Sequence, residues 1–151
     1  MARRAGPLAR TSAFWDASAL VPLCVRQGIT PSVVALYKSY RAVVWWATPV
    51  EIASALARLV RTREISSNDR ANARKVAMAL ADEWSVIQPS NALRANAAQL
   101  VDRYDLKAAD AMQLAAALEW CESIPEDRVF LTSDHKLREA AVLSGFDGKI
   151  I

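Results

Sequence analysis

The sequence predicts an α/β domain in which a mostly parallel sheet is covered by helices on both faces. Short β-rich segments alternate with longer segments of helical periodicity, which is the order expected of a parallel sheet. The expected strands are nearly continuous apolar runs, as strands buried on both faces are. At 151 residues the chain has the size of one domain, so we expect a single domain over residues 1–151.

Five segments are expected to be strands because they are short and rich in apolar, β-branched or aromatic residues. They cover residues 12–16, 42–47, 84–89, 128–134 and 148–151. The first segment, SAFWD, and the fourth, RVFLTSD, both end in an acidic residue.

The remaining segments have helical patterns. A helical segment follows the first strand and extends through residues 31–41. Further helices are expected over 48–64, 67–83, 91–105, 106–122 and 135–145. Thr48 is a candidate N-cap followed by proline at the first helical position, and Gly145 is the expected end of the last helix.

Composition and residue counts exclude several classes of protein. The chain is 53% hydrophobic and 23% charged, and its longest apolar runs are too short to span a bilayer. The first residues lack the apolar core of a secretory signal, and Cys24 and Cys121 are expected to be reduced thiols, so we expect a cytoplasmic protein. His135 is the only histidine, which excludes zinc sites of the Cys/His type. The G-x-S-x-G motif of hydrolases is absent.

The charge of the chain is mildly basic. The formal net charge is +3, which is compatible with a polyanionic partner but is weak support for one. Residues 1–11 form an expected basic tail that contains Arg3, Arg4 and Arg10, and such a tail is most often simply solvated.

Four acidic residues are placed where parallel strands end. Asp16 and Asp134 end the first and fourth strands, Glu51 lies one turn into the helix after the second strand, and Asp110 lies early in the helix 106–122. Ligands of open α/β sheets bind at the carboxyl ends of the strands. We therefore expect these carboxylates to reach the same edge of the sheet.

Each acid also has a purely structural interpretation. Asp16 and Asp134 are suitable helix N-caps, and Thr48-Pro-Val-Glu51 matches a capping box, which is the favoured interpretation of Glu51 taken alone. Asp110 is harder to explain, because its helical neighbours are apolar, although an acid near a helix start is favoured by the dipole.

Carboxylates gathered at one place repel one another, so their pKa values rise or a cation neutralises them. Oxygen ligands without a histidine cluster indicate a hard cation, Mg²⁺ or Mn²⁺. Such sites serve phosphoryl displacement, so the residues point to metal-assisted phosphodiester hydrolysis. A phosphatase with a D-x-D motif is disfavoured, because DASAL lacks the second aspartate.

Four motifs in order resemble those of the PIN-domain ribonucleases, in particular the VapC toxins of bacterial toxin–antitoxin pairs. They are FWDASALV, TPVEIASALARL, LKAADAMQLAAAL and VFLTSDHKL, and together they span nearly the whole chain. The resemblance implies a three-layer α/β/α fold with strand order 3-2-1-4-5. It also implies a cytoplasmic, Mg²⁺- or Mn²⁺-dependent endoribonuclease that cleaves structured RNA, such as loops of transfer or ribosomal RNA.

The resemblance also implies roles for individual residues. Asp16, Glu51, Asp110 and Asp134 match the acidic quartet; Asp16 and Asp110 are expected as direct metal ligands, Asp134 as a direct or water-mediated ligand, and Glu51 as the group that positions or deprotonates water. Ser18 and Thr132 match polar positions beside these acids, with a helix-start hydroxyl as the alternative for Ser18. Arg58 and Arg61 are candidates for RNA contact, although a solvated or dimer-facing surface is the more common role.

The partners implied by the resemblance are an RNA substrate and a small VapB-like antitoxin whose C-terminal segment covers the acidic groove. A homodimer is expected, no membrane is involved, and DNA is bound only indirectly through the antitoxin. The alternatives are a nuclease of RNA maturation or decay without an antitoxin, and an inactive metal-binding regulatory domain. All four acids are present, which counts against the inactive form.

Three features depart from the family pattern. Pro22 replaces a common basic residue after the opening aspartate, and His135 stands where arginine or lysine is frequent. Trp45 and Trp46 form an unusual pair, for which we expect core packing at the strand end; the alternative is a surface that stacks bases or contacts the antitoxin.

Overall fold

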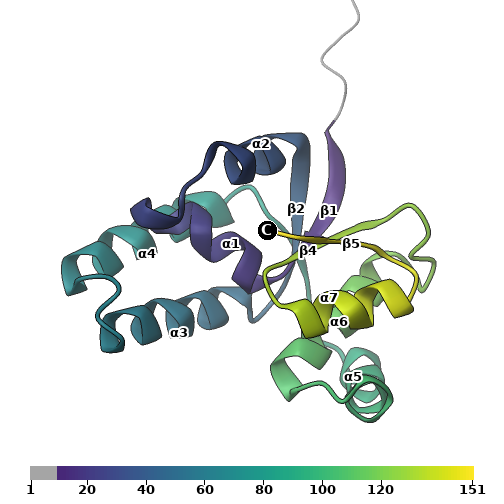
Figure 1. Ribbon diagram of the computed structural model, residues 1–151. Coiled ribbons are helices and arrows are strands. Elements are labelled where there is room, and N and C mark those ends of the chain that lie inside the picture. Colours follow the sequence, from purple (N-terminus) through teal and green to yellow (C-terminus); the bar gives the residue numbers. More distant parts are fainter. Residues whose placement is uncertain (1–9) are drawn as a thin grey trace, which may run out of the picture.

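Five parallel strands form one sheet in the order β3-β2-β1-β4-β5, as expected. The computed structural model describes residues 10–151 (Figure 1). The strands are β1 (Thr11–Trp15), β2 (Tyr40–Trp45), β3 (Ser85–Ile87), β4 (Val129–Thr132) and β5 (Asp147–Ile150). In the central register Phe14 pairs with Val43 of β2 and with Phe130 of β4, so β1 is the middle strand.

Helices cover both faces of this sheet (Figure 1). The helices on one face are α1 (Ala17–Cys24), α2 (Pro31–Ser39), α3 (Thr48–Arg61) and α4 (Ser67–Ala81). The helices on the other face are α5 (Asn91–Tyr104), α6 (Ala108–Trp120) and α7 (His135–Leu143). The predicted α/β fold with three layers is therefore confirmed.

The two cores are separated by the alternation of side chains along the strands. Ala13 and Trp15 of β1 pack with α1–α4, whereas Phe14 between them packs with α5–α7. Phe14 stacks on Phe130 with ring centroids 5.3 Å apart. From Ala13 to Trp15 both faces of the central strand are therefore fully buried, which explains the continuous apolar run in this part of the sequence.

The first helical stretch differs from the expectation. It is divided into α1, a 3₁₀ turn η1 (Arg26–Gly28) and α2, and β2 begins at Tyr40 rather than at residue 42. Thr30 caps α2 by accepting a hydrogen bond from Val33 N, and Pro31 starts the helix. The end of α1 at Cys24 and the new helix start at Pro31 depend on local capping residues, which the pattern of apolar residues does not reveal.

The end of α7 is as expected. Gly145 has a φ of 109°, a conformation that glycine adopts without strain, and Phe146 N donates to Ala141 O. This turn delivers Phe146 into the core beside Phe130. The chain then enters β5 directly.

The remaining expectations about the chain concern its thiols and its first residues. Cys24 and Cys121 are buried free thiols. Of the expected tail, residues 1–9 lie outside the described residues, Arg10 is exposed, and Thr11 already belongs to β1. Among residues 10–151 there is no helix with the length and apolarity that a bilayer crossing requires.

Candidate active site

A cavity of about 360 Å³ opens where β1 and β4 end, and all four predicted acids line it. Asp16 follows β1 directly, and Asp134 follows β4 after Ser133. Glu51 comes from α3 on one face of the sheet, and Asp110 comes from α6 on the other face. The fold therefore brings together residues separated by more than a hundred positions in the sequence.

Asp16 is the most buried of the four acids, with 4% of its surface exposed. It is the N-cap of α1, and its Oδ2 accepts hydrogen bonds from Ser18 N, from Ser18 Oγ and, at 2.9 Å, from Thr132 Oγ1. Oδ1 takes part in none of these bonds. Burial raises the pKa of Asp16, and these hydrogen bonds oppose that rise. Asp16 therefore both caps α1 and belongs to the acidic site.

Ser18 and Thr132 join the ends of β1 and β4. Their hydroxyls lie 3.1 Å apart, Ser133 N donates to Ser18 Oγ at 2.8 Å, and Asp134 N donates to Thr132 Oγ1 at 3.0 Å. Thr132 is fully buried. The two hydroxyls thus fix the backbone that carries both aspartates.

Pro22 adds a further connection between α1 and the end of β4. Within a helix the residue-22 nitrogen would donate to Ser18 O, but proline has no N–H. The Ser18 carbonyl accepts instead from Ser133 Oγ at 3.0 Å. The departure from the family pattern at position 22 therefore has a local structural role.

Asp134 lies at the exposed rim of the cavity. It is the N-cap of α7, and its Oδ1 accepts from Leu137 N at 2.7 Å, so the predicted capping role is correct. Oδ2 takes no part in that bond. A single oxygen of Asp134 therefore suffices for the cap.

The predicted capping box at Thr48 and Glu51 is wrong. α3 begins at Thr48 itself, with Ala47 as N-cap, and the Thr48 side chain is fully buried. The Thr48 hydroxyl accepts from Gln113 Nε2 at 3.3 Å, and Glu51 Oε2 accepts from the same nitrogen at 2.6 Å. The chain enters the helix one residue earlier than the motif assumes, so Thr48 turns inward rather than back over the helix start.

Gln113 is a site residue that the sequence interpretation missed. It is fully buried on α6, one turn after Asp110, and within residues 10–151 its Oε1 has no hydrogen-bond partner. A polar residue inside the apolar run AMQLAAAL was the available signal, because a buried amide must find partners. Its contact with Glu51 ties the helices on the two faces of the sheet to each other.

Asp110 lies in the first turn of α6 and is half-buried. Burial and then the nearby charges of Asp134 and Asp16 raise its pKa to about 6. The helix dipole favours an acid at this position, as the sequence suggested. Burial and the two neighbouring carboxylates outweigh that effect.

The pKa of Glu51 is also raised well above its ordinary value. Burial raises its pKa to about 7, helped by Asp16 and Asp110 and opposed by the hydrogen bond from Gln113. A carboxyl with a pKa near neutrality is suited to exchange protons with water during catalysis. Such perturbed groups in one cavity are characteristic of functional sites.

The oxygen donors of the cavity fit a hard divalent cation. Within the described residues no three His, Cys, Asp or Glu side chains lie close enough together to form a complete ligand set. Mg²⁺ keeps several waters and needs only one or two carboxylates. The buried Asp16 and the half-buried Asp110 supply such a pair. Burial raises the pKa of Asp16, and burial together with the charges of Asp134 and Asp16 raises the pKa of Asp110.

The two predicted arginines differ in position. Arg58 lines the cavity, whereas Arg61 is not among the lining residues. Among residues 10–151 the ion pairs join Lys136 to Asp105 and Lys149 to Asp147. Arg58 therefore has no carboxylate partner within 4.0 Å in this part of the chain.

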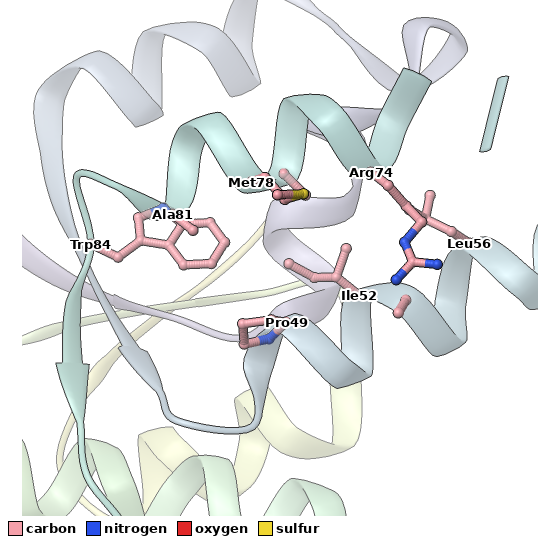
Figure 2. A pocket seen from close by; sticks show the side chains of 9 residues that line it. Pro49, Ile52, Leu56, Arg74, Met78, Ala81 and Trp84 are labelled. Atoms are coloured by element: carbon pink, nitrogen blue, oxygen red, sulfur yellow. The ribbon is translucent and has the colours of Figure 1, made fainter. Parts of the chain in front are cut away.

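A second hollow, of about 140 Å³, lies between α3 and α4 (Figure 2). Ile52, Leu56, Met78 and Trp84 are among its lining residues, and Arg74 is its one charged residue. It contains no acid, so it offers none of the chemistry of the acidic cavity.

Without a divalent cation, the free energy of unfolding should fall as the pH rises from about 4.5 to about 7. Glu51 and Asp110 have pKa values of about 7 and about 6 in the folded state, against ordinary values of 4.5 and 3.8. The folded chain holds more protons in this window, so raising the pH favours unfolding. Urea unfolding in EDTA measures the effect.

Glu51→Gln should flatten part of this slope, and Glu119→Gln, at an exposed acid on α6, should leave it unchanged. Mg²⁺ should restore stability near neutral pH by binding only the folded chain. Identical slopes for the wild type and Glu51→Gln would contradict the electrostatic account.

The comparisons with known proteins agree with this geometry. The family model of the PIN domain matches residues 13–143. One similar solved structure is described as a toxin–antitoxin complex from Klebsiella pneumoniae; the alignment has 17% identity and a TM-score of 0.57, and covers 82% of this chain and 87% of that one. No curated protein matches the chain. From the match over most of its length, the chain belongs to the PIN-domain family, a family of nucleases.

Proposed function

We propose that this chain is a Mg²⁺- or Mn²⁺-dependent endoribonuclease and the toxin of a toxin–antitoxin pair. The observation that carries the proposal is the convergence of Asp16, Glu51, Asp110 and Asp134 on one cavity of a PIN domain. Hydrolysis of a phosphodiester needs a place for developing negative charge and a group that handles the proton of water. The cavity has residues suited to both needs.

In the proposed site, Asp16 and Asp110 hold the cation directly, and Asp134 completes its ligands through a bound water. Ser18 and Thr132 hold Asp16 in place. When bound, the cation neutralises charge on the phosphate and makes water more acidic. Glu51, with its pKa of about 7, accepts or returns a proton near neutral pH. Gln113 fixes the orientation of Glu51 through the 2.6 Å hydrogen bond.

RNA is the proposed substrate, and single-stranded loops suit the site because unstacked bases can be splayed out of the strand. Arg58 on the cavity wall lies free of carboxylate partners within residues 10–151, so it is available to a phosphate. The family resemblance of the four motifs favours transfer or ribosomal RNA. Arg61 lies outside the cavity lining and is proposed only for contacts beyond the scissile phosphate.

An antitoxin partner is supported by the structural similarity to a chain from a toxin–antitoxin complex. In this proposal a small VapB-like antitoxin covers the acidic groove, the toxin acts as a homodimer in the cytoplasm, and DNA is contacted through the antitoxin only. The second candidate, a nuclease of RNA maturation, shares the site but needs no antitoxin.

Asp110→Asn should reduce RNA cleavage at least about 100-fold, because it removes a charge that holds the cation. Asp102→Asn is the matched control, since Asp102 is an exposed acid on α5 that does not line the cavity. Cleavage of labelled RNA with Mn²⁺, and its loss in EDTA, measures the effect. Full cleavage by both Asp110→Asn and Asp16→Ala would show that the site is assigned wrongly.

Gln113→Leu should lower kcat about tenfold with little change in KM, because Glu51 loses its 2.6 Å partner. The hydrogen bond lowers the pKa of Glu51, so its loss should move the acidic limb of the pH–rate profile to higher pH. Gln99→Leu, at an exposed position on α5, is the control. An unshifted profile would show that Gln113 is merely a packed residue.

Expression of the chain in a bacterial host should arrest growth, and Glu51→Gln should relieve the arrest by removing the proton-accepting group. Co-expression of a short reading frame adjacent to the gene should also relieve it. Growth curves and RNA gels from the same cultures measure both effects. RNA cleavage without growth arrest, in the absence of such a reading frame, would favour the RNA-maturation nuclease.

A further inference from the structure

We propose that a hollow beside Trp46 binds an unstacked base of single-stranded RNA, a few nucleotides from the scissile phosphate. This inference rests on the proposed ribonuclease function and adds a binding site outside the acidic cavity. The hollow has a volume of about 420 Å³ and is bounded by the end of β2, the start of α5 and one residue of α6. Its aromatic wall is formed by Trp45 and Trp46.

Trp46 presents an exposed indole on a rigid support. Its side chain is 55% exposed, whereas Trp45 is only 6% exposed and belongs to the core. The two rings meet edge to face, with centroids 6.4 Å apart and planes at 67°. Trp46 N donates to Ile87 O at 3.1 Å, which holds the backbone against the end of β3. The expected core packing is therefore correct for Trp45 and wrong for Trp46.

The other residues that line the hollow include polar and positively charged side chains. Arg94 lines the hollow and is exposed, and within residues 10–151 neither ion pair involves it. Ser90 and Asn91 lie at the start of α5, where backbone N–H groups and the helix dipole favour an anion. An aromatic face beside a cation matches a nucleotide, in which a flat base is joined to a phosphate.

The hollow and the acidic cavity lie on either side of the first turns of α6. Asp110 lines the cavity and Met112 lines the hollow. Residues two positions apart on a helix point in nearly opposite directions, so the two sites are separated by about one helix diameter, roughly 10 Å. A single strand that places its phosphate at Asp110 can therefore reach Trp46 within a few nucleotides.

A nucleotide explains the hollow better than an apolar peptide does. Ser90, Asn91 and Arg94 make much of the rim polar, whereas the hollow between α3 and α4 is almost wholly apolar (Figure 2). A peptide that buried these polar groups without pairing them would lose binding energy. Phosphate and base edges satisfy them.

The test measures binding of a fluorescein-labelled single-stranded RNA 12-mer to the full chain in EDTA by anisotropy. Trp46→Ala should weaken binding about tenfold, and Trp46→Phe should retain most of the affinity, because either ring stacks on a base. Arg94→Ala should lower the salt dependence of log Kd by about 0.7, the value for one phosphate contact on a single strand. Met78→Ala and Arg103→Ala, at exposed positions away from the hollow, are the controls.

A second series replaces each base of the 12-mer in turn by an abasic nucleotide. One position should weaken binding to the wild type and have no further effect on Trp46→Ala, which identifies the stacked base. If Trp46→Ala misfolds, Arg94→Ala still tests the site from a different element.

The outcomes separate this inference from the proposed function. Cleavage that depends on Asp110 but RNA binding that is unchanged in Trp46→Ala and Arg94→Ala would overturn the base site and leave the ribonuclease intact. Failure of the wild type to bind or cleave RNA would overturn both. Weakened binding of an antitoxin peptide, with RNA binding unchanged, would assign the hollow to a protein partner and overturn the inference.

Discussion

The hydrogen bond from Thr132 Oγ1 to Asp16 Oδ2 joins the two strand ends on which the site is built. β1 and β4 are adjacent in the sheet, but their residues are more than a hundred positions apart in the chain. Because Asp16 is almost completely buried, its carboxylate depends on this bond and on Ser18 for compensation. The rest of the cavity is arranged around this anchored group, with Glu51 and Asp110 brought in from opposite faces.

The protein places mutually repelling acids where the fold is otherwise best packed. Trp15 and Leu131, which precede the site on the two strands, are fully buried. Such packing supplies the rigidity that holds the carboxylates together against their repulsion. Burial, together with the charges of the neighbouring acids, raises the pKa values of Glu51 and Asp110, and a bound cation would offset both effects.

Much of this structure is encoded in local sequence patterns. The strand-end acids Asp16 and Asp134 are visible because an apolar run stops at a carboxylate, and both caps follow from ordinary helix-start chemistry. The capping-box prediction is wrong because the same residues, Thr48 and Glu51, also fit a helix in which Thr48 points inward. In the structure the Thr48 hydroxyl accepts a hydrogen bond from Gln113 instead of capping the helix. That choice depends on a residue 65 positions away, and such pairing has no signature in a single sequence. The sequence also does not show which tryptophan of the adjacent pair is buried: Trp45 takes the core position, and Trp46 is exposed.

The proline at position 22 is structurally linked to Ser133, which lies far from it in the sequence. The proline leaves the Ser18 carbonyl for the hydroxyl of Ser133, so the two positions form one structural unit. A relative with a basic residue at position 22 regains the helical N–H and has no need of that hydroxyl. We therefore expect positions 22 and 133 to covary within the family, with proline accompanied by serine or threonine.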